Sequence, residues 1–135
     1  MLIAIVDAKA QEVKADDILG NWITPEKDLV VHCYKVNNQY FGKIVWFKKY
    51  GDAIPDEVYA VPQEKWLHYV VMKDFVFQKS KWKNGKITEV RKGATYDAYI
   101  AIENKNTLNV KGFYVLKFIN KSQLFKRYEE SKLPD

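Results

Sequence analysis

Residues 40–47 read Tyr40-Phe41-Gly42-Lys43-Ile44-Val45-Trp46-Phe47. The stretch combines β-branched and aromatic residues with one glycine and no proline, which is typical of a β-strand. Strand alternation places the even-numbered residues, Tyr40 to Trp46, on one face and the odd-numbered residues on the other. A glycine inside a strand marks a bulge, a bend or a close approach of other atoms. A bent strand with aromatic side chains on both sides of its glycine predicts a closing β-barrel.

Similar runs continue along the chain. Residues 29–36 form one of them, and the turn signal Asn37-Asn38-Gln39 joins it to the first stretch as a hairpin. A helix over Glu64 to Met72 competes with a strand over part of the next run. About eight strand-like segments without helix–strand alternation favour an antiparallel barrel or sandwich over a parallel α/β fold. The other strand-like runs lie at residues 66–78, 96–102, 108–118 and 122–128.

Turn signals and a second central glycine complete this pattern. Asp16 to Leu19 predicts a short helical turn with aspartate as its cap. We expect Gly42 and Gly112 to lie at strand bends. Apolar residues on both faces of several runs suit a barrel whose interior is filled or holds a ligand. The predicted turns are Asn84-Gly85, Arg91-Lys92-Gly93, Asn104-Lys105-Asn106 and Asn120-Lys121.

Composition limits the class of protein. The chain has 135 residues, 47% of them hydrophobic, which predicts one ordered domain with a core of its own. The net charge of +5 is compatible with anionic partners, but the lysines are spread along the chain, as on a solvated surface. Cys33 is the only cysteine, so an intramolecular disulfide and a four-thiolate zinc site are excluded. We expect Cys33 to be a small buried hydrophobe.

The first ten residues differ from the rest. An apolar run from Leu2 to Val6 precedes Ala8-Lys9-Ala10, which has the small-x-small form of a signal-peptidase site. We therefore expect residues 1–10 to be a remnant of a secretory signal and residues 11–135 to be a single domain that is secreted or periplasmic. An ordinary N-terminal strand or arm is the alternative, since Asp7 interrupts the run and a basic start is missing. No stretch is long and apolar enough to span a membrane.

Motifs occur at Ile18 to Trp22, Tyr40 to Trp46, Trp82 with Gly85-Lys86-Ile87, Gly93 to Tyr96, Leu108 to Phe113, and Ser122 to Arg127. Together these motifs resemble domain-of-unknown-function family 2147, a family of small exported bacterial proteins. The resemblance implies an all-β, antiparallel lipocalin-like (calycin) barrel in the cell envelope, and it covers about residues 16–128. The chain departs from the family pattern at Thr88-Glu89-Val90 and at Ile119-Asn120-Lys121.

The resemblance also suggests roles for individual residues. Lipocalin-like barrels commonly stack a C-terminal arginine over the tryptophan of Gly-x-Trp, which implies that Arg127 covers Trp22 and closes one end. A small hydrophobic ligand in the interior is the leading expectation, and a core completely filled by aromatic rings is the alternative. The candidate ligand-lining residues are Tyr40, Trp46, Tyr96, Tyr114 and Phe118.

Signs of catalysis are weak. His32 and His68 are the only histidines, both in strand-like runs, and the sequence contains no nucleophile elbow, zincin motif or phosphate loop. We expect no enzyme activity, cofactor or metal. A binder of single-stranded nucleic acid is a third reading, with Phe41, Lys43, Phe47 and Lys49 on one face, and the predicted export disfavours it.

Overall fold

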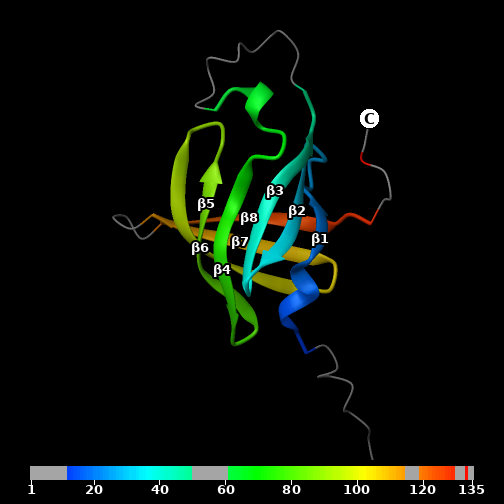
Figure 1. Cartoon of the computed structure of the whole chain (residues 1–135), viewed down its shortest axis with the longest axis vertical. Helices are drawn as coiled ribbons and strands as arrows, with labels where there is room; N and C mark the ends of the chain where they lie inside the picture. Colours follow the sequence, from blue (N-terminus) through cyan, green and yellow to red (C-terminus); the bar gives the residue numbers. More distant parts are fainter. Residues whose placement is uncertain (1–11, 50–60, 115–118, 130–132, 134–135) are drawn as a thin grey trace, which may run out of the picture.

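The computed structural model describes residues 12–49, 61–114, 119–129 and 133, and within that part it is a barrel. Two short 3-10 turns, η2 (Ala15–Ile18) and η4 (Gln63–Lys65), lie at opposite ends of the barrel (Figure 1). The predicted all-β fold with a short N-terminal helical turn is confirmed. The strands are β1 (Gly20–Ile23), β2 (Leu29–Val36), β3 (Gln39–Phe47), β4 (Val70–Gln78), β5 (Lys81–Glu89), β6 (Ala94–Asn104), β7 (Thr107–Tyr114) and β8 (Ile119–Arg127).

The strands form a meander that closes on itself. Each strand pairs with the next one in antiparallel orientation, and β8 returns to β1. The closing contact is short, with Trp22 opposite Arg127 and Ile23 opposite Lys126. Closure removes the free sheet edges, at which an open sheet of this size would be prone to pair with other chains.

The observed turns differ from the predicted ones at two places. The Asn37-Asn38 turn is present, and both residues have positive φ angles (49° and 67°), as asparagine tolerates. The predicted Asn84-Gly85 turn is wrong, because β5 runs through it and the chain reverses at Lys79-Ser80 instead (φ 54° and 66°).

Asn84 still has a positive φ of 63°, since it lies where the pairing of β5 with β6 is irregular. The predicted Asn120-Lys121 turn is also wrong, because both residues belong to β8. The competing helix over residues 64–72 is reduced to the single turn η4, and β4 begins at Val70.

Aromatic side chains fill one half of the barrel, next to η2. Trp22, Phe75 and Trp82 are completely buried there, and the Trp82 indole donates a hydrogen bond to the carbonyl of Ala15 (3.1 Å). The Tyr40 ring packs edge-on against Trp82. η2 thus plugs this end of the barrel interior.

Glycines let the walls approach this filled core. Gly42 lies where the β3–β4 register shifts, and a Cβ atom there would come within 2.8 Å of the Met72 sulfur. Gly112 pairs in regular register with both neighbouring strands, and its missing side chain makes room for Ile87. Strand bends are predicted at both glycines; the pairing is irregular at Gly42 and regular at Gly112, where the missing side chain is needed for close packing.

Candidate functional site

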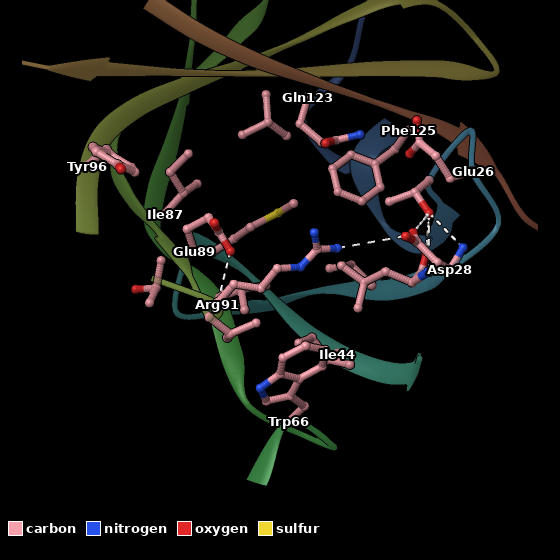
Figure 2. A pocket seen from close by; sticks show the side chains of 18 of the residues that line it. Glu26, Asp28, Ile44, Trp66, Ile87, Glu89, Arg91, Tyr96, Gln123 and Phe125 are labelled. Atoms are coloured by element: carbon pink, nitrogen blue, oxygen red, sulfur yellow. Dashed lines mark hydrogen bonds and ion pairs between the residues drawn. The ribbon is translucent and has the colours of Figure 1, made fainter. Parts of the chain in front are cut away.

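The half of the barrel away from η2 contains a cavity of about 500 Å³. It opens beside the turn that joins β1 to β2 and the turn that joins β5 to β6 (Figure 2). This volume lies within the range of small-molecule sites in proteins. Its apolar lining residues are Leu29, Val31, Ile44, Trp66, Val71, Met72, Ile87, Val90, Tyr96, Val110 and Phe125.

Polar side chains border the same cavity. Four of them come from the two turns at the entrance and four from strands β5 and β8, so a charged rim surrounds the apolar floor. Three carboxylates and one guanidinium are among them. The polar lining residues are Thr24, Glu26, Asp28, Thr88, Glu89, Arg91, Ser122 and Gln123.

The β1–β2 turn holds Asp28 in a fixed position. The Thr24 hydroxyl donates a hydrogen bond of 2.6 Å to Oδ1 of Asp28. The same hydroxyl oxygen accepts the backbone N–H groups of Asp28 (3.0 Å) and Leu29 (3.1 Å). Thr24 is only 5% exposed, so this network orders the turn from below.

The β5–β6 turn carries Arg91 to the opposite side of the opening. Its backbone N–H donates to a carboxylate oxygen of Glu89 (2.9 Å), and Gly93 supplies a positive φ of 70°. The Arg91 side chain extends across the cavity, and its Nη2 lies 3.8 Å from Oδ2 of Asp28 (Figure 2). An ion pair therefore bridges the mouth of the barrel.

Trp66 forms part of the wall. It is 3% exposed, its indole donates to the carbonyl of Val61 (2.6 Å), and its ring meets Phe47 edge-on at 5.2 Å between centroids. The backbone N–H of Val61 in turn donates to the carbonyl of Val90 (3.1 Å). The segment before β4 is thereby attached to the β5–β6 turn beside the opening.

A bulge in β3 changes which of its residues face inward. Val30 pairs with Trp46 and Val31 pairs with Ile44, so Val45 is an extra residue. Beyond the bulge the alternation is inverted, and Phe47 packs against the core while Trp46 does not line the cavity. The expected inward position of Trp46 is corrected, because one inserted residue flips every side chain that follows.

The other four predicted ligand-lining residues are distributed differently. Tyr96 borders the cavity. Tyr40 is buried at the plugged end, where its hydroxyl donates to Oδ1 of Asp16 (2.7 Å). The Tyr114 side chain and the whole of Phe118 lie outside the described residues. Of the three whose side chains the structure describes, Tyr96 alone borders the cavity.

The charged rim was not predicted. The sequence has turn signals at or beside Asp28, Glu89 and Arg91. In turns, the residue pattern does not predict which way a side chain points. One signal was available: in an up-and-down meander, alternate turns lie at the same end. The β1–β2 and β5–β6 turns must therefore share one end of the barrel, which brings Arg91 near Asp28.

The predicted pair at the plugged end is in contact. Cζ of Arg127 lies 4.0 Å from the centroid of the Trp22 ring. The guanidinium also donates to the carbonyls of Leu19 (2.9 Å) and Asp17 (2.8 Å). Arg127 is therefore occupied by structural contacts on the side of the barrel away from the cavity.

The residues considered for catalysis or nucleic-acid binding do not form a common site. Burial raises the pKa of the Cys33 thiol to about 12, which keeps the sulfur protonated and unreactive. Burial and nearby Lys43 lower the pKa of His32, whose Nδ1 lies 2.7 Å from Oδ1 of Asn21. His68 is exposed.

The predicted nucleic-acid face is divided by the bulge in β3. Phe41 stacks on Tyr34 with 5.7 Å between ring centroids, and the Lys43 ammonium lies over the same Tyr34 ring. Phe47 instead packs against the core. In the described part of the chain, no group of three or more His, Cys, Asp or Glu residues could hold a metal ion. No helix there is long and apolar enough to cross a membrane.

Comparison with known proteins agrees with this architecture. Residues 20–127 match the family described as "Uncharacterized protein conserved in bacteria (DUF2147)". The chain belongs to this family. The DUF2147 barrel is also similar to the solved structure of protein HP1028 from Helicobacter pylori, described as belonging to the lipocalin family. The two structures superpose with a TM-score of 0.63 at 20% sequence identity, and the match covers 88% of this chain and 86% of the HP1028 chain. No curated protein matches significantly.

Proposed function

We propose that this DUF2147 barrel is a non-enzymatic binding protein that encloses the apolar part of a small molecule. The observation that carries the proposal is the cavity of about 500 Å³ with an apolar floor and a polar rim. Such a combination is typical of sites that bury a ligand's hydrocarbon part and orient its polar part. The lipocalin-like fold supports the same reading.

The plugged half of the barrel defines how deep a ligand reaches. Rings of Tyr40, Phe75 and Trp82 occupy that half, so a completely hollow barrel is excluded among the described residues. We therefore apply the filled-core alternative to this half and place the proposed ligand in the other half.

A series of straight-chain alcohols tests the proposal, because these probes carry no charge. Binding of octanol, decanol and dodecanol is measured by titration calorimetry. Each methylene buried in the cavity contributes about 0.8 kcal/mol, so affinity should rise about fourfold per carbon until the cavity is full. Affinity that does not depend on chain length would contradict burial of the chain.

Two substitutions of the same kind locate the binding. Val110→Phe adds bulk inside the cavity, whereas Val76→Phe adds it on the outer surface, where Val76 is 37% exposed. We expect the first to weaken decanol binding at least about tenfold and the second to leave it unchanged. If Val110→Phe does not fold, Gln123→Trp replaces it as the test. This change narrows the rim without altering the core and should also weaken decanol binding at least about tenfold. Equal effects of all three variants would overturn the proposal.

We also propose that the natural protein is exported. The small-x-small motif Ala8-Lys9-Ala10 and the resemblance to exported proteins support this compartment. The test is recovery of the protein from the envelope or medium fraction of the producing cells and sequencing of its N-terminus. A mature chain that begins at Gln11 is expected, and an unprocessed chain in the cytosolic fraction would refute export.

A further inference from the structure

The ion pair at the mouth has two unequal partners. The Asp28 side chain is 19% exposed and the Arg91 side chain is 53% exposed. Asp28 is held by the Thr24 hydroxyl at 2.6 Å, whereas Arg91 is a long side chain that reaches across the opening from a turn (Figure 2). Their nitrogen–oxygen separation of 3.8 Å is beyond normal hydrogen-bond length, so these two atoms form an ion pair without a hydrogen bond.

The difference in exposure and anchoring indicates which of the two side chains moves when a ligand binds. The Arg91 side chain borders the opening and is half-exposed, so its guanidinium remains hydrated when a head group takes its place beside Asp28. Asp28 cannot follow, because its turn is fixed. A carboxylate that is only 19% exposed is stabilised by a neighbouring positive charge, so a cationic head group beside Asp28 can replace the guanidinium there.

We propose that the cavity takes amphiphiles with a cationic head group, such as a primary ammonium, whose charge replaces the Arg91 guanidinium beside Asp28. The inference rests on the proposed function and adds the chemical class of the ligand. Arg91 then occupies the place of the head group while the cavity is empty. Glu26 and Glu89 at the same rim increase the preference for a cation, because an anionic head would face three carboxylates and one guanidinium.

The preference runs against the charge of the whole protein. The chain carries a net charge of +5, which by itself attracts anions. Tighter binding of a cation than of an anion with the same hydrocarbon chain therefore reports the local field of the mouth.

The test compares dodecylamine, dodecanol and dodecanoate, each below its micellar concentration, by titration calorimetry with the full chain. The three share one hydrocarbon chain and differ only in the charge of the head. A charge-assisted pair with Asp28 should make the amine bind about tenfold tighter than the alcohol, with dodecanoate weakest.

Two variants, each with a matched control, test whether the preference for a cationic head group comes from the Asp28–Arg91 ion pair. Asp28→Asn keeps an oxygen that can accept the Thr24 hydroxyl, and it should reduce the amine affinity to that of the alcohol. The matched control is Asp97→Asn, which removes the same charge from the outer surface, where Asp97 pairs with Lys86. Arg91→Gln removes the resident competitor and should strengthen amine binding, whereas Lys92→Gln at the neighbouring exposed position should not.

The outcomes separate the two proposals. If none of the three compounds binds, the cavity is not a ligand site, and both proposals fail. If all three bind equally, or if dodecanoate binds tightest and Arg91→Gln abolishes its binding, the cationic preference is overturned and cavity binding stands. If Asp28→Asn proves unfolded by its melting curve, the Arg91→Gln result alone decides.

Discussion

Arg127 stabilises the plugged end through two kinds of contact. Its guanidinium lies over the Trp22 ring, and its Nη atoms bind the carbonyls of Leu19 and Asp17 at the end of η2. Backbone carbonyls at the end of a helical turn need such donors. One side chain from the last strand thereby fixes the first strand and the plug, which are more than a hundred residues away in the sequence.

The first prediction concerns this pair. Arg127→Ala should lower the free energy of unfolding by about 1–3 kcal/mol, since it removes the stack and frees two carbonyls. Trp22→Ala should cost about 3–5 kcal/mol because it also leaves a cavity. Urea unfolding measures both, with Lys73→Ala on the exposed surface of β4 as the control, expected within about 0.5 kcal/mol of wild type.

The double variant completes the cycle. Residues in contact couple, so Trp22→Ala with Arg127→Ala should cost less than the sum of the two single changes. Simple additivity would mean that the two side chains do not interact in solution.

Cys33 gives a prediction about pH. Its thiol has an ordinary pKa of 9.0, and burial raises this pKa to about 12 in the folded chain. Between these values the unfolded chain releases the proton and the folded chain keeps it. The stability that Cys33 contributes is therefore complete below pH 9 and is lost as the pH rises toward 12.

The stability difference between wild type and Cys33→Ala isolates this effect, because alanine does not titrate and other groups cancel. Measured by urea unfolding, that difference should shift against wild type by about 1.4 kcal/mol between pH 8 and pH 10. A difference that stays constant over this range would show that the thiol ionises as easily in the folded protein as in the unfolded one.

At the scale of the strands, alternation predicts faces well until a bulge intervenes. Residues 40–44 of β3 alternate as their sequence predicts, and one extra residue at Val45 then reverses Trp46 and Phe47. The turns show the same limit. Asn37-Asn38 reverses the chain, whereas Asn84 supplies its positive φ inside β5. Local residue preference reports a backbone angle, and only the pairing of the neighbouring strands decides whether that angle makes a turn or a bulge.

The irregular β5 gives the third prediction. A Cβ atom on Gly85 would lie 2.5 Å from two carbon atoms of the Phe75 ring. One on Gly112 would lie 2.9 Å from the flexible end of Ile87 and 3.5 Å from Cβ of Tyr96. Gly85→Ala should therefore destabilise the barrel by about 3 kcal/mol, at the upper end of overpacking costs, and Gly112→Ala by about 1 kcal/mol. Thermal or urea unfolding measures both.

A compensating change tests the cause. Phe75→Leu removes the ring that Gly85→Ala would strike, so the double variant should be more stable than the sum of the single changes predicts. If Phe75→Leu gives no such relief, the cost of alanine at position 85 comes from backbone conformation and not from the ring.

At the scale of the whole molecule, the barrel could be predicted because many separate segments of the sequence indicate it. Strand-like runs at short spacing and the family motifs each lead to the same closed meander. The cavity could not be predicted, because its size and position depend on how far the aromatic rings from opposite walls reach into the interior. Tyr40 and Tyr96 both occur in alternating strands, yet one seals the plugged half and the other borders the open half.

The last prediction concerns the plug. Described contacts with the core begin at Val13 and Ala15, and the carbonyl of Ala15 accepts the Trp82 indole N–H. Ile18, at the end of η2, is 1% exposed and accepts the Trp22 indole N–H through its carbonyl (2.8 Å). The plug is thus a structural part of the barrel, and it is distinct from the first ten residues, which we expect to be a signal remnant.

Two truncations separate these segments. Removal of residues 1–10 should leave the melting temperature nearly unchanged, because every core contact described above is kept. Removal of residues 1–18 takes away η2, uncovers Trp22 and Trp82 and leaves their indole donors without these carbonyls, so it should lower the melting temperature by tens of degrees or prevent folding. Calorimetry of the two truncated chains beside the full chain gives the answer. A large loss already after the shorter truncation would show that Leu2 to Val6 belongs to the folded domain, and the signal-remnant interpretation would have to be abandoned.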